Sequence, residues 1–125
     1  MVVGSGLAGI CAAVGAAREG AIVRLIESRP CLGGGIGKEV QFPYDFEGAT
    51  NFAYQRETGI LEEIMSSIFK ENHEGNYCGQ ERALINWITN EERLGIFLET
   101  QLFEVKKNAT GDKIESIIGI SNQLE

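Results

Sequence analysis

The sequence predicts an α/β fold in which a strand–helix–strand unit with a parallel sheet is followed by two further helices and a C-terminal β-hairpin. Glycines follow a short apolar strand at residues 2–3, an alanine-rich segment spans residues 8–19 up to Gly20, and an apolar strand over residues 21–26 ends in Glu27. Twelve helical residues rise ~18 Å and six extended residues span ~20 Å. The helix is therefore long enough to return the chain, so that the second strand can run parallel to the first. We therefore expect a right-handed βαβ crossover, with Gly20 ending its helix.

The glycines form the segment Gly4-Ser5-Gly6-Leu7-Ala8-Gly9, which has GxGxxG spacing at the point where a strand gives way to a helix. The first glycine of this motif permits a tight turn, the second lets the backbone approach a pyrophosphate, and the third lets the helix pack closely on the sheet. The helix N-terminus adds unpaired N–H groups and a partial positive charge. The segment predicts a Rossmann-like site for a dinucleotide diphosphate.

Glu27 stands where a carboxylate can accept both hydroxyls of an adenosine ribose, and its charge would repel a 2′-phosphate, which disfavours NADP. With strand, glycine motif, helix and terminal acid in register, a dinucleotide site is better supported than a glycine-rich turn beside a solvated glutamate. A second glycine run, Gly33-Gly34-Gly35, follows. It is either a second place for close backbone approach to a ligand or a plain flexible loop.

The remaining elements follow from periodicity. Residues 56–70 carry apolar side chains at helical spacing and predict an amphipathic helix, and residues 80–93 predict another. Residues 96–98 predict a third parallel strand, which we place beside the first. Residues 102–105 and 113–118 predict the hairpin. The aromatic-rich residues 36–54 have no clean period; they either approach a ligand or close the edge of a small core.

Length and composition narrow the class of protein. The 125 residues have a formal net charge of −7. Without a Lys/Arg stripe, this charge argues against nucleic acid as a partner. We expect a single domain over residues 1–125 that is incomplete, because the first strand is short and the apolar residues 117–120 end abruptly. No apolar run approaches the ~20 residues of a membrane span, and no secretory signal is recognised, so we expect a cytoplasmic protein.

Several stretches together resemble the N-terminal end of FAD-dependent oxidoreductases of the glutathione-reductase-like superfamily. They are residues 2–9, the small-residue helix, residues 22–30 and Leu32-Gly33-Gly34. More narrowly, they resemble the group related to fumarate reductase flavoproteins, in which Glu-x-Arg-Pro, a Gly-Gly pair and a Ser-Glu-Val-like segment follow in this order. Here Lys38-Glu39-Val40 has a lysine in place of the serine. The Arg-Glu-Thr-Gly-like residues 56–59 also match this group.

The resemblance implies FAD as the cofactor. The glycine motif would hold its diphosphate, residues 27–29 its adenosine end, the second glycine run its ribityl side, and a backbone group of the hairpin its adenine. The candidate cofactor-binding residues are therefore Gly4, Ser5, Gly6, Leu7, Ala8, Gly9, Glu27, Ser28, Arg29, Gly33, Gly34 and Leu102. No catalytic residue and no metal site is predicted. The three cysteines lack CxxC spacing, and residues 34–77 lack the Cys-x4-Cys pair of the disulfide reductases.

The function that these residues favour is the FAD-binding part of an oxidoreductase, which binds the ADP moiety of FAD for hydride transfer to or from a small-molecule substrate. The remainder of the flavoprotein chain would be its partner. An NAD-dependent dehydrogenase domain is the first alternative, but it leaves Arg29, the second glycine run and the hairpin unexplained. A non-catalytic nucleotide-binding remnant is the second alternative, motivated by the short first strand and the absence of the later flavin-site segments.

Overall fold

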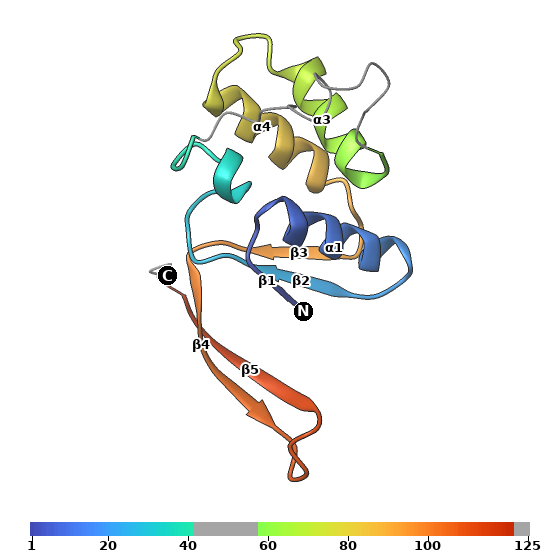
Figure 1. The fold of residues 1–125 in the computed structure, drawn as a ribbon, viewed down its shortest axis with the longest axis vertical. Coiled ribbons are helices and arrows are strands. Elements are labelled where there is room, and N and C mark those ends of the chain that lie inside the picture. The colour runs from blue at the N-terminus through green and yellow to red at the C-terminus, as the bar shows by residue number, and fades with distance from the viewer. Residues whose placement is uncertain (42–57, 122–125) are drawn as a thin grey trace, which may run out of the picture.

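The computed structural model describes residues 1–41 and 58–121. The elements in chain order are β1 (Val2–Val3), α1 (Leu7–Arg18), β2 (Val23–Ile26), the 3₁₀ helix η1 (Gly34–Ile36), α3 (Ile60–Glu71), α4 (Tyr77–Ile88), β3 (Leu94–Phe97), β4 (Thr100–Lys107) and β5 (Ile114–Ser121). Helix α1 packs on the sheet, α3 and α4 lie beyond α1, and the β4–β5 hairpin extends away on the other side (Figure 1). This arrangement confirms the predicted α/β fold. The predictions for residues 42–57 lie outside the described residues.

The three-stranded sheet is parallel and has the order β1-β2-β3. The strand after the two helices therefore pairs with the second strand, and our prediction that it lies beside the first was wrong. All four residues of β2 pair with β3, from Val23 opposite Leu94 to Ile26 opposite Phe97. Strand β1 has only two residues and offers a shorter edge. A third strand beside the second is also the order of doubly wound nucleotide-binding sheets.

The helix boundaries follow local capping chemistry. Gly20 has φ +95° and donates its N–H to Ala17 O at 3.0 Å, which confirms that it ends α1. Helix α3 begins at Ile60, because Gly59 has a non-helical φ of +68°, and residues 56 and 57 of the predicted helix lie outside the described residues. Helix α4 begins three residues earlier than predicted, where the Asn76 side chain caps it by accepting from Gly79 N at 2.8 Å.

Helix α4 also ends five residues earlier than predicted. Residues 89–93 form a turn, because Arg93 O already accepts from Val23 N at 2.8 Å and so aligns the chain with β2.

In residues 1–41 and 58–121, no helix is long and apolar enough to cross a membrane.

The core lies between the sheet and the three α-helices. Its largest fully buried apolar side chains come from each of these layers and from the segment between β2 and η1: Ile10, Val14, Leu25, Leu32, Ile64, Leu84 and Ile88. Helix α1 is the middle layer, and its small residues, such as the fully buried Ala13, let the flanking elements approach it closely. The core thereby fixes the N-terminus of α1 relative to the ends of β1 and β2.

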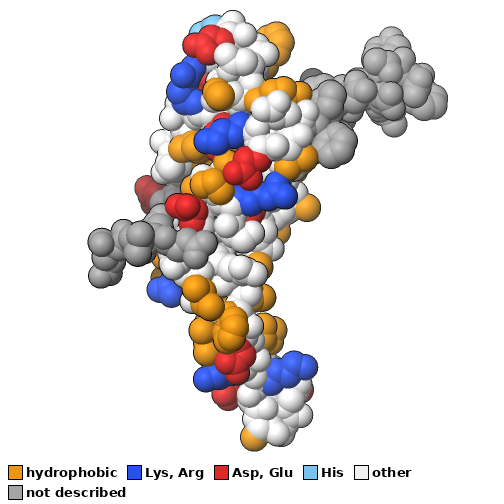
Figure 2. All heavy atoms as spheres, turned by 90° about the vertical axis from the view of Figure 1, so that its left-hand side faces the viewer, with side chains coloured by type: hydrophobic (Ala, Val, Ile, Leu, Met, Phe, Trp, Pro, Cys, Tyr) orange, Lys and Arg blue, Asp and Glu red, His pale blue; other side chains and the backbone are white. Residues whose placement is uncertain are grey.

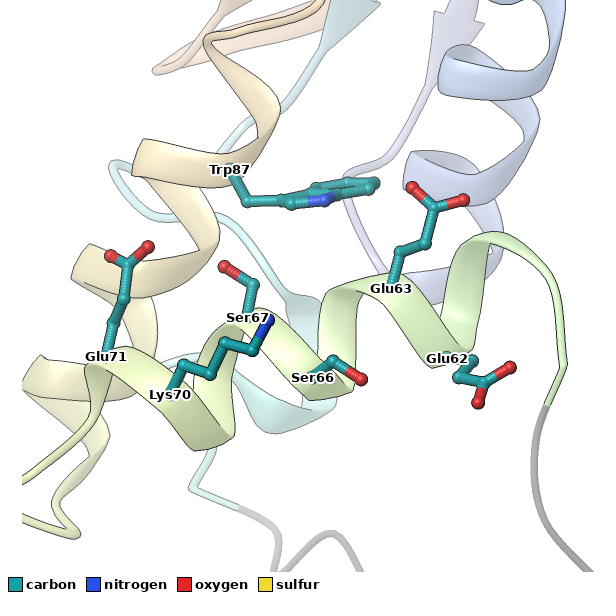
Figure 3. A pocket seen from close by; sticks show the side chains of 7 residues that line it. All are labelled: Glu62, Glu63, Ser66, Ser67, Lys70, Glu71 and Trp87. Atoms are coloured by element: carbon teal, nitrogen blue, oxygen red, sulfur yellow. The ribbon is translucent and has the colours of Figure 1, made fainter.

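Arg18 joins three parts of this helical layer. Its guanidinium donates to both carboxylate oxygens of Glu63 at 2.8 and 2.7 Å, and to Glu91 at 3.0 and 2.7 Å. It also lies 5.9 Å from the ring centroid of Trp87. Beside this cluster is a hollow of about 480 Å³ between α3 and Trp87 (Figure 3). Arg18 therefore ties α1 to α3 and to the turn after α4.

Replacement of Arg18 by alanine is expected to lower the free energy of unfolding by about 1 kcal/mol, the upper end for exposed ion pairs, because one guanidinium holds two carboxylates. In a chain of 125 residues the melting temperature should fall by roughly 4 °C. Thermal unfolding followed by circular dichroism measures the change. Arg82→Ala is the control, because its pair with Glu74 is longer, at 3.8 Å, and both side chains are about 60% exposed. Equal effects of the two substitutions would contradict the assigned role of Arg18.

Candidate functional site

The glycine motif forms the turn from β1 into α1. Gly4 has φ +96° and donates its N–H to Ile26 O at 2.8 Å, a bond that belongs to the parallel pairing of Val3 with Ile26. Gly6 is the N-cap residue of α1, and its carbonyl oxygen accepts from Ile10 N at 2.9 Å. Leu7, Ala8 and Gly9 then form the first helical turn, whose N–H groups have no partner within the helix. The predicted diphosphate-binding segment is therefore a strand-to-helix turn that leads into N–H groups without a partner inside the helix.

Two glycines of the motif face different surroundings. A Cβ atom on Gly9 would overlap the carbonyl oxygen of Gly4 and lie 3.7 Å from the side chain of Val2. A Cβ atom on Gly6 would meet nothing within 4 Å. Gly9 is thus required for close packing of α1 on β1, whereas Gly6 leaves open space at the helix N-terminus. That space fits a phosphate group brought close to the backbone.

The Glu27 carboxylate fastens this turn to the end of β2. Oε2 accepts from the backbone N–H and the hydroxyl of Ser5 at 2.8 and 2.7 Å. Oε1 accepts from Arg29 N at 3.0 Å and from the Ser28 hydroxyl at 3.3 Å. Ser5 is fully buried and Glu27 is only 9% exposed. A carboxylate has about four acceptor sites, and four protein donors already occupy them. A ribose hydroxyl that bound Glu27 would therefore be a fifth donor, or would replace the Ser28 hydroxyl, whose bond is the longest.

The charge of Glu27 follows from the balance of burial and hydrogen bonding. Burial alone would raise the pKa of this carboxyl, but the hydrogen bonds from Ser5, Arg29 and Ser28 outweigh it and lower the pKa below its ordinary value. Glu27 is therefore ionised at neutral pH. A fixed negative charge at this point supports the expectation that a 2′-phosphate would be repelled.

The second glycine run lies directly against the first. Gly33 donates its N–H to Ser5 O at 2.9 Å, and Gly6 and Gly33 form an isolated parallel bridge. Gly34 has φ +55°, and a Cβ atom there would lie 2.9 Å from the Cα atom of Gly6. The close approach that the structure shows is therefore between two backbone segments of the chain, and close approach to a ligand stays a prediction. Two glycine segments that are far apart in the sequence meet beside the N-terminus of α1.

The start of β4 and the residue before it contact the end of β2 through backbone bonds, whereas the adenine contact expected of Leu102 stays a prediction. Thr100 donates its N–H to Glu27 O at 2.9 Å, and Glu99 donates to Arg29 O at 3.1 Å. Leu102 lies further along β4 and pairs with Gly119 of β5. Sequence reasoning did not predict the backbone bonds of Glu99 and Thr100 to residues 27–29, because they depend on how β3 pairs with β2. It also missed the bond from Ser5 to Glu27, although a serine inside the motif was a usable signal.

Cys31 lies between Arg29 and the second glycine run and is 3% exposed. Burial raises the pKa of this thiol, and the nearby carboxylates of Glu39 and Glu81 raise it further. The thiol therefore stays protonated at neutral pH, where it is a poor nucleophile.

The parallel sheet, the glycine turn at the N-terminus of α1 and the ionised acid at the end of β2 define a Rossmann-like nucleotide-binding domain. The family model described as "FAD dependent oxidoreductase" matches residues 1–124, and the chain belongs to this family. It is accordingly an FAD-binding flavoprotein domain, and the family's activity is oxidoreduction.

A solved structure supports the fold independently. The crystal structure of Thermovibrio ammonificans THI4 matches 95% of this chain with a TM-score of 0.56 and 16% sequence identity. At this identity the likeness concerns the fold alone. The match covers 46% of the THI4 chain, so the present chain spans about half the length of that protein. Among curated proteins the comparison finds no match.

Replacement of Glu27 by glutamine is expected to lower the free energy of unfolding at pH 7 by about 1–3 kcal/mol, because buried donors of Ser5 lose a charged acceptor. The pKa of Glu27 is lowered in the folded protein from its ordinary value of 4.5. Its contribution is therefore present above pH 4.5 and is lost as the pH falls through the folded-state pKa. The difference between wild type and E27Q should shrink towards pH 3.

Urea unfolding at a series of pH values measures this difference. Glu92→Gln, in the exposed turn before β3, controls for the general effect of removing one carboxylate. A difference between wild type and E27Q that is the same at pH 7 and pH 3 would show that the Glu27 charge does not hold the turn.

Proposed function

We propose that this chain is the N-terminal, FAD-binding part of a flavoprotein oxidoreductase of the glutathione-reductase-like superfamily, in the group related to fumarate reductase flavoproteins. The whole enzyme would transfer a hydride to or from a small-molecule substrate. The observation that carries the proposal is the meeting of two glycine segments at the N-terminus of α1, where Gly34 lies against Gly6 and the space beside Gly6 stays open. The ionised Glu27 lies at the same end of the sheet.

The proposed binding residues divide by the part of FAD that each would hold. The segment from Gly4 to Gly9, including Ser5, Leu7 and Ala8, would bind the diphosphate through backbone N–H groups. The adenosine end would contact residues 27–29, and the ribityl chain would run beside Gly33 and Gly34. Bound FAD would supply the redox chemistry, while these residues bind and orient it. The adenine contact proposed for Leu102 would be made by its backbone.

The alternatives account for fewer of these contacts. An NAD-dependent dehydrogenase domain explains the glycine motif and Glu27, but gives no role to the packing of Gly34 on Gly6. Membership of the FAD dependent oxidoreductase family also favours the flavin. A non-catalytic nucleotide-binding remnant would keep the Glu27 contacts and bind nucleotide without turnover.

We further propose that residues 1–125 are a single, incomplete domain, and that the remainder of the flavoprotein covers the hairpin. Apolar side chains gather over the hairpin and its root (Figure 2). Phe97 is 46% exposed, Phe103 69% and Ile114 56%. Such a concentration of exposed apolar surface is typical of an interface. A cytoplasmic location stays a prediction from the sequence.

Replacement of Gly6 by valine is expected to weaken FAD binding by roughly 10-fold or more, because the side chain would fill the space proposed for the diphosphate. The fold should persist, because a Cβ atom there meets nothing within 4 Å. Quenching of flavin fluorescence on titration with the protein measures the affinity, and circular dichroism checks the fold. Gly6→Ala should have a smaller effect than Gly6→Val.

Two results would overturn the proposal. Unchanged FAD affinity in a folded Gly6→Val variant would remove the glycine motif from the site. Tight binding of NAD without any binding of flavin would replace the flavoprotein function by the dehydrogenase alternative.

A further inference from the structure

The segment that follows the second glycine run is held by one helix. Three side chains from the first turns of α4 reach the segment over residues 36–41. The Tyr77 hydroxyl donates to Gln41 O at 3.0 Å, Gln80 Nε2 donates to Ile36 O at 2.8 Å, and Glu81 Oε2 lies 3.0 Å from Lys38 Nζ. Positions three and four apart on a helix share one face. A single face of α4 therefore holds the segment at three points.

Of the three contacts from α4, the ion pair between Glu81 and Lys38 is the one that involves a buried charge. Glu81 is 8% exposed, whereas the side chain of Lys38 is 43% exposed. A carboxylate withdrawn from water is unfavourable unless a partner compensates its charge. Lys38 supplies that charge, and its own pKa is raised by the hydrogen bond to Glu81. Burial of Glu81 thus depends on Lys38 staying where it is.

The position of Lys38 is connected to the glycine contact through a short run of backbone bonds. Gly37 donates its N–H to Gly34 O at 3.0 Å, and Gln41 donates to Gly37 O at 2.9 Å. A Cβ atom on Gly37 would lie 2.6 Å from Leu32 O, so this turn is closely packed. Gly34 in turn lies against Gly6. Movement of Lys38 would therefore be transmitted to the place where the two glycine segments meet.

We propose that Glu81 is a positioning residue which, through Lys38, holds residues 33–41 against Gly6 and so sets the shape of the FAD site beside Gly33 and Gly34. Glycine-rich backbone has much conformational freedom to lose, and a segment ordered before the ligand arrives loses less of it on binding. The part of this inference that concerns FAD rests on the proposed function. The part that concerns the order of residues 33–41 does not.

Two measurements on Glu81→Gln test the inference. In the protein without FAD, the amides of Gly37 and Gln41 should exchange hydrogen at least about 5-fold faster than in wild type, while the amide of Leu25 in β2 should be unaffected. The FAD dissociation constant should rise by about 5-fold or more. Arg82→Gln, on an exposed face of the same helix, is the matched control and should change neither.

A second variant shows whether Glu81 acts through Lys38. Lys38→Gln should give the same two changes at least as strongly, because it leaves the Glu81 carboxylate buried without its partner, and the double variant should be no worse than Lys38→Gln alone, because both substitutions remove one interaction. If Glu81→Gln does not fold, the two measurements are made on Lys38→Gln instead. Additive effects of the two substitutions would overturn the assigned route through Lys38.

The outcomes separate the inference from the proposed function. Unchanged exchange at Gly37 and Gln41 overturns the positioning role whatever the protein binds. Faster exchange with unchanged FAD affinity overturns the effect on the site. If wild type binds no FAD, the proposed function fails, and the exchange measurement still decides whether Glu81 orders the segment.

Discussion

The contact between Glu27 and Ser5 is the interaction on which the rest of the site depends. Ser5 is fully buried inside the turn that leaves β1, and both its backbone N–H and its hydroxyl donate to one oxygen of Glu27. Without that carboxylate, two buried donors would lose their acceptor, which is unfavourable. The carbonyl group of Ser5 accepts from Gly33. One serine therefore joins the ends of β1 and β2 to the second glycine run.

This arrangement gives the glycine motif two separate physical tasks. Gly9 allows α1 to lie against the turn, where any side chain would overlap the Gly4 carbonyl group. Gly6 has no such neighbour and keeps the helix N-terminus accessible. The same six residues therefore specify both how the helix packs and where an anion can approach. Glu27 likewise combines a structural task with the negative charge expected to select against a 2′-phosphate.

Local patterns predicted much of this fold, and pairing between distant segments accounts for what they missed. The βαβ unit, the end of α1 at Gly20 and the acid at the end of β2 follow from spacing and residue type within 27 residues. The place of β3 does not, because it depends on which strand edge is free. The ends of α3 and α4 depend on the φ of Gly59 and on the alignment of Arg93 with Val23.

The candidate site divides in the same way. The sequence predicted its glycines and Glu27, and the structure brings both glycine runs together beside that acid. The sequence did not predict that Ser5 would donate to the Glu27 carboxylate, nor that Glu81 of α4 would pair with Lys38. Both contacts join residues that are far apart in the chain. The adenine contact of Leu102 was inferred from the resemblance and stays a prediction, and the backbone bonds of Glu99 and Thr100 to residues 27–29 were not predicted.

The most direct test of the account compares the binding of ADP with that of ADP carrying a 2′-phosphate on its ribose, by isothermal titration calorimetry of the wild-type chain. A site built from the N-terminal N–H groups of α1 beside an ionised Glu27 should bind ADP and should bind the 2′-phosphorylated form at least about 10-fold more weakly. Equal affinities, or preference for the 2′-phosphate, would contradict the assignment of Glu27 to the adenosine end of the site.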